Sequence, residues 1–239
     1  MRLNYWSLKR PWFKLRGNLV QVSVNEYKER RENVEIEKAN TELRNASATD
    51  IVRWALAQNK RTIATTSFGK NAAVMLHVIS AVDREVPTVW VDTGYNLRDT
   101  YVVAEKLIKR IPLDYRVYSP QTTSERRNAV MGGIPTIEDE VMHKEFTRQV
   151  KLEPFDRALR ELQPEIWLTG IREQETEHRK GLDIVSMDAR GILKVAPLFY
   201  WSDDQVEAYM EANALISCRH YFDPTKVHDG RECGMHTSA

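Results

Sequence analysis

Short apolar runs alternate with amphipathic segments over most of this chain. The runs that we expect to form strands lie at 62–66, 88–91, 115–118, 165–170 and 193–198. Apolar residues at helical spacing, such as Met75, Val78, Ile79 and Val82, predict a helix after the first run, and two more are expected at 98–111 and 155–162. Strands that alternate with helices are typical of a mostly parallel sheet covered on both faces, so the expected fold class is α/β.

The two ends of the chain lack this alternation. A capping box at 202–205 opens the last predicted helix, and regular patterning stops after Leu215. We therefore expect an N-terminal extension at 1–47, an α/β domain at 48–215 and a C-terminal tail at 216–239.

Composition narrows the class of protein. Of the 239 residues, 42% are hydrophobic and 29% are charged. No apolar run approaches the roughly 18 residues of a membrane span, which favours a soluble protein without membrane association. The start of the chain lacks the apolar core of a signal peptide, so the cytoplasm is the expected location.

The amino-terminal segment carries basic residues interleaved with aromatic ones. They are Arg2, Lys9, Arg10, Lys14 and Arg16, together with Trp6, Trp12 and Phe13. Such a pattern can bind single-stranded nucleic acid, or the rings can pack on the domain while the charges face water. A formal net charge of +1 gives no global field that would recruit nucleic acid, so we favour packing.

Three of the predicted strands run directly into polar, sharply turning sequence. These strand exits are Ser67–Asn71, Asp92–Tyr95 and Thr169–Arg172. Open α/β sheets bind ligands at the carboxyl ends of their strands, near the switch point in the strand order. We therefore expect the three loops to converge on one crevice.

The first exit joins a strand to a helix, so its backbone N–H groups and the helix N-terminus can hold phosphate, and Lys70 adds a cation there. An ordinary strand-to-helix connection is the alternative. The loop is not a Walker A motif, because Ala64 stands where that motif needs glycine and Asn71 where it needs serine or threonine. The chemistry of the P-loop NTPases is therefore disfavoured.

The loop after the third exit gathers four candidate anion ligands, Arg172, His178, Arg179 and Lys180. Arginine suits bidentate contact with phosphate or sulfate oxygens. The alternative is a surface loop whose cations are balanced by its own glutamates. At the second exit, Asp92 either binds ribose hydroxyls or a cation, or caps the turn that follows it.

Both cysteines, Cys218 and Cys233, lie near the carboxyl end. Two thiols cannot supply the four ligands of an ordinary iron–sulfur cluster or four-cysteine zinc site, and the histidines lack ligand spacing, so no bound metal is expected. Cys233 lies two residues from Arg231 and three from His236, with Glu232 opposing them, and is either a reactive thiolate or an exposed cysteine without function. Cys218 is expected to pack as a small hydrophobic side chain.

Six motifs carry a further signal through their order in the chain. They are Ser67–Ala73, Val91–Tyr95, Lys151–Pro154, Trp167–Arg179, Lys194–Leu198 and Glu232–His236. In this order they resemble the motifs of the sulfonucleotide reductases, and within that family those of the cluster-free reductases of phosphoadenosine phosphosulfate (PAPS). The resemblance covers about residues 48–239. It implies a Rossmann-like fold of the adenine nucleotide α-hydrolase class.

The resemblance implies the reduction of PAPS to sulfite and adenosine 3′,5′-bisphosphate in sulfate assimilation. Thioredoxin or glutaredoxin would be the electron donor, and the assembly would be a homodimer with 1–47 as a candidate contact. Cys233 would attack the sulfate sulfur and carry an S-sulfonate, on a mobile tail supported by Glu232 and His236. No iron–sulfur cluster is implied, because the sequence lacks the cysteine pairs of the cluster-containing relatives.

The resemblance also implies a set of substrate-binding residues. They are Ser67, Phe68, Gly69, Lys70, Asn71, Asp92, Thr93, Gly94, Lys151, Gly170, Arg172 and Arg179. The two lysines and two arginines among them would neutralise the charge of the sulfate. Three alternatives stay open: a cluster-free reductase of adenylyl sulfate, an ATP-using adenylyltransferase or pyrophosphatase of the same fold, and a non-catalytic nucleotide or nucleic-acid binder that uses the basic amino terminus.

The chain departs from the family pattern at two places. The segment 217–228 is shorter than in cluster-free relatives, which puts the closed position of the tail and its substrate contacts in question. Glu173 stands where family members often have a second arginine.

Overall fold

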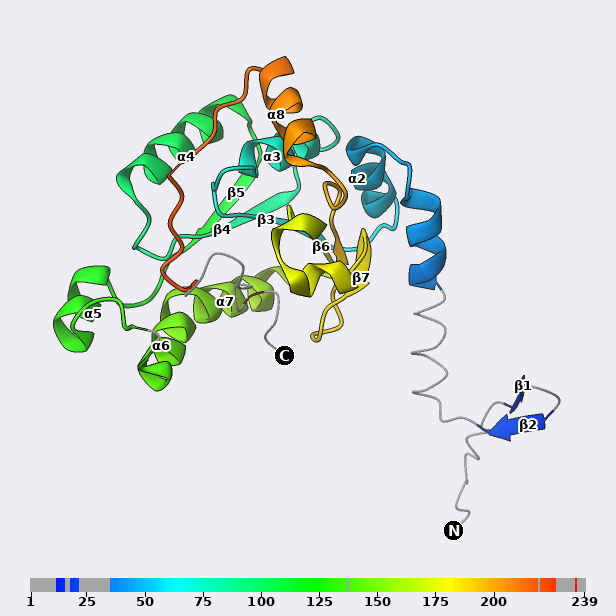
Figure 1. The fold of residues 1–239 in the computed structure, drawn as a ribbon, viewed down its shortest axis with the longest axis horizontal. Helices are drawn as coiled ribbons and strands as arrows, with labels where there is room; N and C mark the ends of the chain where they lie inside the picture. The colour runs from blue at the N-terminus through cyan, green and yellow to red at the C-terminus, as the bar shows by residue number, and fades with distance from the viewer. Residues whose placement is uncertain are drawn as a thin grey trace, which may run out of the picture. The chain divides into compact units, whose positions relative to one another are not determined.

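The computed structural model describes residues 35–136, 138–218, 220–226 and 235 (Figure 1). It also describes the backbone of residues 12–15 and 18–21. The chain divides into two units, Met1–Arg44 and Asn45–Ala239. In the first unit, β1 (Trp12–Leu15) pairs antiparallel with β2 (Asn18–Gln21), and a helix covers 35–43. The side chains of the basic and aromatic amino-terminal cluster lie outside the described residues, as do Glu232, Cys233 and His236.

The second unit is built on one six-stranded sheet. Its strands are β3 (Thr62–Thr66), β4 (Pro87–Val91), β5 (Asp114–Tyr118), β6 (Ile166–Leu168), β7 (Val185–Met187) and β8 (Leu193–Val195). Their order across the sheet is β5-β4-β3-β6-β8-β7. All neighbouring pairs are parallel except β7 with β8. From β3 the chain continues outward to β4, whereas from β6 it continues in the other direction, so the switch point lies between β3 and β6.

Helices cover both faces of this sheet (Figure 1). The α-helices are α2 (Ala48–Leu56), α3 (Ala72–Ser80), α4 (Arg98–Arg110), α5 (Ser124–Met131), α6 (Glu140–Thr147), α7 (Glu153–Leu162) and α8 (Asp203–Ala212). A π-helix, η1 (Arg148–Leu152), joins α6 to α7, and two 3₁₀-helices, η2 (Glu173–Glu175) and η3 (Glu177–Gly181), follow β6. Among the described helices, none is long and apolar enough to span a bilayer.

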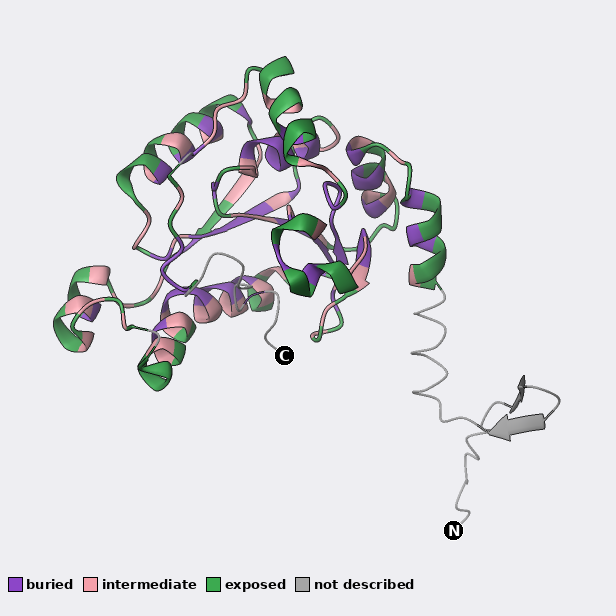
Figure 2. Ribbon diagram, viewed as in Figure 1, coloured by how far each residue is buried: buried purple, intermediate pink, exposed green. Residues whose placement is uncertain are grey.

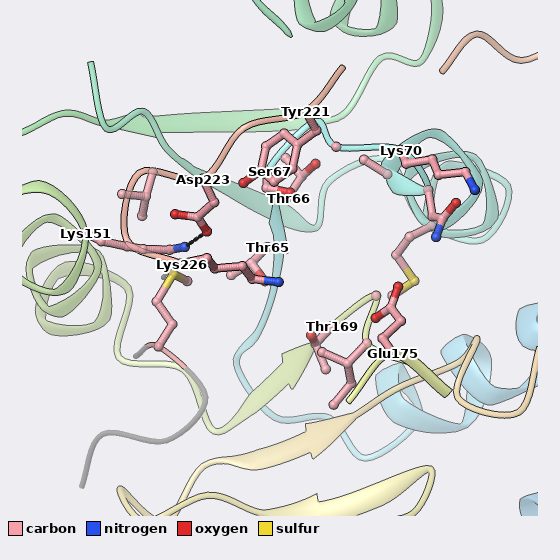
Figure 3. A pocket seen from close by; sticks show the side chains of 18 of the residues that line it. Thr65, Thr66, Ser67, Lys70, Lys151, Thr169, Glu175, Tyr221, Asp223 and Lys226 are labelled. Atoms are coloured by element: carbon pink, nitrogen blue, oxygen red, sulfur yellow. Dashed lines mark hydrogen bonds and ion pairs between the residues drawn. The ribbon is translucent and has the colours of Figure 1, made fainter. Parts of the chain in front are cut away.

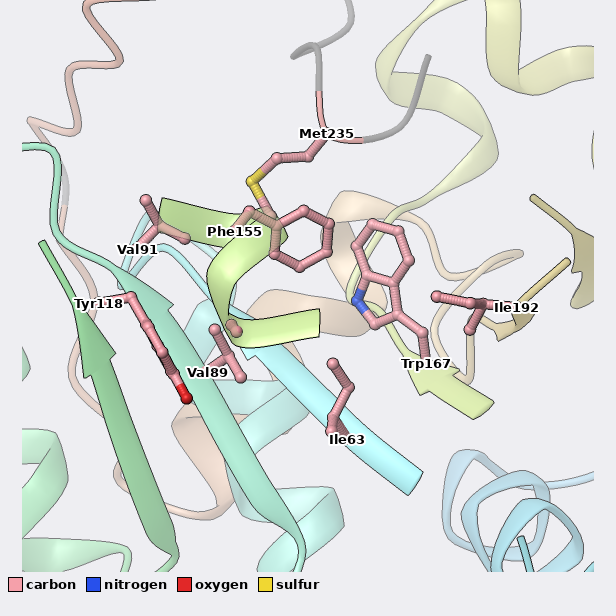
Figure 4. Close-up of a cluster of buried hydrophobic side chains, with 9 residues drawn as sticks. Ile63, Val89, Val91, Tyr118, Phe155, Trp167, Ile192 and Met235 are labelled. Atoms are coloured by element: carbon pink, nitrogen blue, oxygen red, sulfur yellow. The ribbon is translucent and has the colours of Figure 1, made fainter. Parts of the chain in front are cut away.

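Val89–Val91 of β4 and the whole of β6 are buried on both faces, which explains their continuous apolar sequence (Figure 2). Successive side chains of β4 point to opposite faces of the sheet. Val89 and Val91 pack with Phe155 of α7, whereas Trp90 packs with Leu107 of α4. Figure 4 shows the first of these two clusters, with Phe155 of α7 packed over the side chains of the strands.

The predicted α/β class and the mostly parallel sheet are confirmed. The capping box at Ser202 is also confirmed, since its side chain accepts the Gln205 N–H and the Gln205 side chain accepts the Ser202 N–H. The antiparallel strand β7 was not predicted, because three residues are too few for a periodic signal. The ladder of β8 ends at Val195, earlier than the predicted 198, two residues before Pro197, which has no N–H to donate.

Candidate active site

A cavity of about 590 Å³ opens at the carboxyl ends of β3, β4 and β6 (Figure 3). Its wall includes residues from all three predicted strand exits, together with side chains from η1 and from the segment after α8. The expected convergence of the three loops is therefore confirmed. The cavity lies at the switch point in the strand order, where an open sheet of this kind binds its ligands.

The Ser67 loop is anchored by Phe68. The Thr66 hydroxyl accepts the Phe68 N–H at 3.1 Å, and Phe68 has a φ of 51°, a left-handed conformation that is uncommon for a residue with a side chain. Its ring is fully buried and packs edge-on against Trp90, with the ring centroids 4.9 Å apart. Core packing therefore holds a strained turn that presents the neighbouring backbone to the cavity.

The start of α3 faces the same cavity. Asn71 is the N-cap residue of this helix, and its side chain makes no capping hydrogen bond. The first turn carries no acidic residue, so its N–H groups and the helix dipole favour an anion. Lys70 extends from the same loop, and its carbonyl accepts a hydrogen bond from the Ser217 hydroxyl at 2.8 Å, which links the loop to the segment after α8.

Asp92, at the exit of β4, is engaged within its own loop. One carboxylate oxygen, Oδ1, accepts hydrogen bonds from the Gly94 N–H at 3.0 Å, from the Asn96 amide at 2.9 Å and from the Tyr101 hydroxyl at 2.8 Å. Burial and this bond to Asp92 raise the pKa of Tyr101 to about 12. Asp92 does not line the cavity, although Thr93 and Asn96 do. The geometry favours the turn-capping interpretation of Asp92.

The loop after β6 holds its two arginines through one glutamate. Glu175 lies on the cavity wall and pairs with the Arg179 guanidinium, and its other oxygen lies 3.5 Å from the guanidinium of Arg172. Arg172 is buried, donates to Asp203 at 2.8 Å and to the Trp201 carbonyl at 3.2 Å, and does not line the cavity. The hydrogen bond from the Arg172 guanidinium is the main cause that lowers the pKa of Asp203.

Lys151 reaches the cavity from the π-helix η1, a type of helical turn that is frequent at functional sites. Its side chain is buried and its ammonium group donates to the carboxylate of Asp223 and to the Thr225 hydroxyl at 3.4 Å. Burial alone would raise the pKa of Asp223, but the Lys151 charge and the hydrogen bonds from Lys151 and Thr225 outweigh it, so the pKa is lowered. Asp223 is therefore a carboxylate at neutral pH.

The segment after α8 forms one side of the cavity through Tyr221, Asp223, Pro224 and Lys226. The Tyr221 ring lies so close to the Ser67 loop that a Cβ on Gly69 would stand 3.2 Å from it. Met235 also lines the cavity and is buried in the cluster that contains Phe155 (Figure 4). The first four of these residues belong to the segment 217–228, in which the chain departs from the family pattern, whereas Met235 belongs to the Glu232–His236 motif.

The structure brings most of the predicted substrate-binding residues to the cavity. Those on its wall are Ser67, Gly69, Lys70, Asn71, Thr93, Lys151, Gly170 and Arg179. Those that do not line it are Phe68, Asp92, Gly94 and Arg172. Cys233, Glu232 and His236 lie outside the described residues, and Met235 is the described residue nearest to Cys233 in the sequence.

The wall residues that sequence reasoning missed include the polar side chains of Asn96, Glu175, Tyr221, Asp223 and Lys226. Glu175 had a weak signal, because it lies four residues before Arg179 and three after Arg172, the spacing at which side chains on a helix meet. The Asp-Pro dipeptide at 223–224 marks a turn but says nothing about the partner of that turn. Only the path of the chain over the sheet brings this turn to Lys151.

The predicted packing of Cys218 agrees with its burial. Its side chain is 1% exposed and its sulfur lies 3.4 Å from the Thr100 hydroxyl. Among the residues that the structure describes, no group of three or more His, Cys, Asp or Glu side chains is arranged to hold a metal ion.

Comparison with known sequences identifies the chain's relatives. A family profile, the phosphoadenosine phosphosulfate reductase domain, matches residues 61–223. A phosphoadenosine 5′-phosphosulfate reductase of Synechocystis sp. is 32% identical over 220 residues, covering 82% of this chain and 88% of the relative. One of Synechococcus sp. is 34% identical over 177 residues, covering 74% of this chain and 76% of the relative.

A solved structure agrees with the sequence relatives. The phosphoadenylyl-sulfate (PAPS) reductase of Candida auris, crystallised as a phosphate complex, superimposes with a TM-score of 0.66 at 25% identity. The match covers 83% of this chain and 90% of that one. The relatives and the structure therefore agree on both the family and the fold.

Proposed function

The chain belongs to the phosphoadenosine phosphosulfate reductase family, and we propose that it reduces PAPS to sulfite and adenosine 3′,5′-bisphosphate through Cys233, with thioredoxin as the electron donor. The observation that carries this proposal is the placement of Met235. This residue packs on the wall of a cation-lined cavity, and Cys233 precedes it by two residues in the sequence. Two residues span at most about 7 Å, so a chain held at Met235 limits how far Cys233 can lie from this wall.

The cavity offers a cationic environment that suits this substrate. Lys70, Lys151 and Arg179 line its wall, and the start of α3 supplies backbone N–H groups. Attack on the sulfur of a sulfate group requires that the negative charge on its oxygens be balanced, which fixed cations do without reorganisation. In the proposed site, Lys151 and Arg179 are held in place by carboxylates before the substrate arrives.

The proposed reaction has two steps. The Cys233 thiolate attacks the sulfate sulfur, forming a sulfur–sulfur bond while the bond from that sulfur to the phosphate oxygen breaks, and adenosine 3′,5′-bisphosphate leaves with the electron pair. A thioredoxin thiolate then attacks the Cys233 sulfur, and sulfite leaves with the electron pair of the sulfur–sulfur bond. The second thioredoxin thiol resolves the mixed disulfide, so the dithiol supplies both electrons and Cys233 is regenerated.

The first step can be tested without any reductant. Incubation with PAPS is expected to add the mass of one SO₃ group to the protein, and peptide mapping is expected to place it on Cys233. Cys233→Ser should abolish the adduct. Cys218→Ser is the matched control, because that thiol is buried and the adduct should form normally. An adduct on Cys218, or none at all, would show that the proposed mechanism is wrong.

The second step separates the reductants, and the rate of the first step separates the substrates. The isolated S-sulfonate is expected to release sulfite when reduced thioredoxin is added, and glutaredoxin in its place tests the other donor. Adenylyl sulfate, which lacks the 3′-phosphate, tests the alternative substrate. Faster adduct formation with adenylyl sulfate than with PAPS would reverse the substrate assignment.

A further inference from the structure

We propose that Lys226 binds a phosphate group of the nucleotide, a role that none of the sequence motifs assigns to it. The inference rests on the proposed function, because it takes the nucleotide to be the substrate or product of that reaction. Lys226 belongs to the segment after α8, which contributes one wall of the cavity and departs from the family pattern.

The position of the side chain supports this role. Lys226 lines the cavity, and its ammonium group extends into the middle of the space between the Lys151 side and the exit of β6 (Figure 3). Lys151 is paired with Asp223 and Arg179 with Glu175. Within the part of the chain that the structure describes, the Lys226 ammonium makes no hydrogen bond or ion pair. It therefore carries positive charge that no described carboxylate balances.

The backbone that carries Lys226 is fixed. The Lys226 N–H donates to the Asp223 carbonyl at 3.1 Å. The Thr225 N–H and hydroxyl both donate to one carboxylate oxygen of Asp223, at 3.0 and 2.7 Å, while the other oxygen pairs with Lys151. Asp223 and Thr225 are both buried. The exposed Lys226 side chain thus projects from a turn that is anchored to η1, so binding an anion need order only the side chain and not the backbone that carries it.

The charge of the ligand fits this arrangement. PAPS carries two phosphate groups and one sulfate, which together bear about four negative charges at neutral pH. Four cationic side chains line the cavity, Lys70, Lys151, Arg179 and Lys226, but two carboxylates, Glu175 and Asp223, lie among them. Without Lys226 the wall would offer only one more cation than carboxylates. The ammonium group of Lys226, whose charge no described carboxylate balances, can donate a charge-assisted hydrogen bond to a phosphate in this cavity.

The test measures equilibrium binding of two nucleotides by calorimetry. Adenosine 3′,5′-bisphosphate and AMP share the 5′-phosphate and differ in the 3′-phosphate. Lys226→Ala is expected to weaken binding of the bisphosphate by about 10-fold to 100-fold, the range for losing one charge-assisted hydrogen bond. Lys226→Arg keeps the charge and is expected to restore most of the affinity.

Lys109→Ala is the matched control. Lys109 is an exposed residue in the last turn of α4 and does not line the cavity, so this variant removes the same charge from another place. The affinity of Lys109→Ala for both nucleotides is expected to stay within about twofold of that of the unmodified chain, because distant exposed charges are screened. Thermal unfolding of each variant checks that the fold is retained.

Each outcome of the two titrations has a definite meaning. A loss confined to the bisphosphate supports the proposal with Lys226 at the 3′-phosphate, and an equal loss for both nucleotides supports it with Lys226 at the 5′-phosphate. Unchanged affinity for both in a folded Lys226→Ala variant overturns it. Because no sulfate chemistry is involved, normal nucleotide binding without formation of an S-sulfonate would overturn the proposed function and leave the role of Lys226 standing.

Discussion

The ammonium group of Lys151 contacts the carboxylate of Asp223, a residue 72 positions later in the chain. Both side chains are buried, with 8% and 4% of their surface exposed. The pair ties η1 to the segment after α8 at the wall of the cavity. A substrate sulfate that reaches Lys151 must therefore share it with Asp223 or displace Asp223, so the pair connects substrate binding to the position of this segment.

A double-mutant cycle separates the structural role of this pair from its catalytic role. Asp223→Leu or Lys151→Met alone leaves one buried charge without its partner, which is expected to lower the free energy of unfolding by about 3–5 kcal/mol. The double variant Lys151→Met/Asp223→Leu replaces the pair by apolar groups and is expected to regain most of that stability. Denaturant unfolding measures both effects.

The rate of S-sulfonate formation is not expected to recover with stability in the double variant. If Lys151 balances the sulfate charge, the stable double variant will still form the S-sulfonate at least about tenfold more slowly than the unmodified chain. A double variant with normal stability and a normal rate would show that the pair is only structural.

Acid should weaken the same pair. Because the pKa of Asp223 is lowered in the folded state, its contribution to stability is fully present above the ordinary aspartate pKa of about 3.9. The contribution is lost as the pH falls from that value through the folded-state pKa, where Asp223 becomes protonated. The stability of the unmodified chain is therefore expected to fall more steeply below pH about 4 than that of Lys151→Met/Asp223→Leu. Parallel curves would contradict this account.

High pH should lower the stability of the fold partly through Tyr101. Its pKa is raised from 10.0 to about 12, so between these values the unfolded state loses the phenolic proton while the folded state keeps it. This group therefore lowers stability as the pH rises from about 10 to about 12. Tyr101→Phe is expected to remove that part of the decline. The phenolate absorbance of the folded chain should lose a component that titrates near pH 12 in the same variant if the assignment is right.

A side chain at position 69 should crowd the Ser67 loop. A Cβ at this position would lie 3.2 Å from the Ser67 hydroxyl and 3.2 and 3.3 Å from two carbons of the Tyr221 ring. Gly69→Ala is expected to cost about 1–3 kcal/mol of stability through overpacking, and to weaken nucleotide binding because the loop must shift. Gly181→Ala is the control, since a Cβ there meets nothing within 4 Å. Relief of the Gly69→Ala defect by Tyr221→Ala would identify the ring as the cause, and no relief would place the cause elsewhere.

The strands and their exits could be predicted from the sequence, because a buried strand has a local run of apolar residues. Val89–Val91 is apolar without interruption, and the structure buries both of its faces. Phe68 shows where this reasoning reached its limit. The resemblance placed it among the substrate-binding residues, yet its ring fills the core beside Trp90 and holds the loop from behind. A loop motif specifies which residues occur together but not which of them faces the cavity.

The sequence by itself determined the α/β class, the positions of the central strands and the three loops that meet at the cavity, because these depend on the period of apolar residues and on turn-forming residues at strand ends. Tertiary structure decided the partners of the charged groups. It pairs Asp223 with Lys151 and Asp203 with Arg172, and it places Lys226 on the wall of the cavity. These contacts join residues far apart in a chain whose last part has no periodic pattern. Only the path of that part over the sheet determines which charges meet, and a one-dimensional pattern does not specify this path.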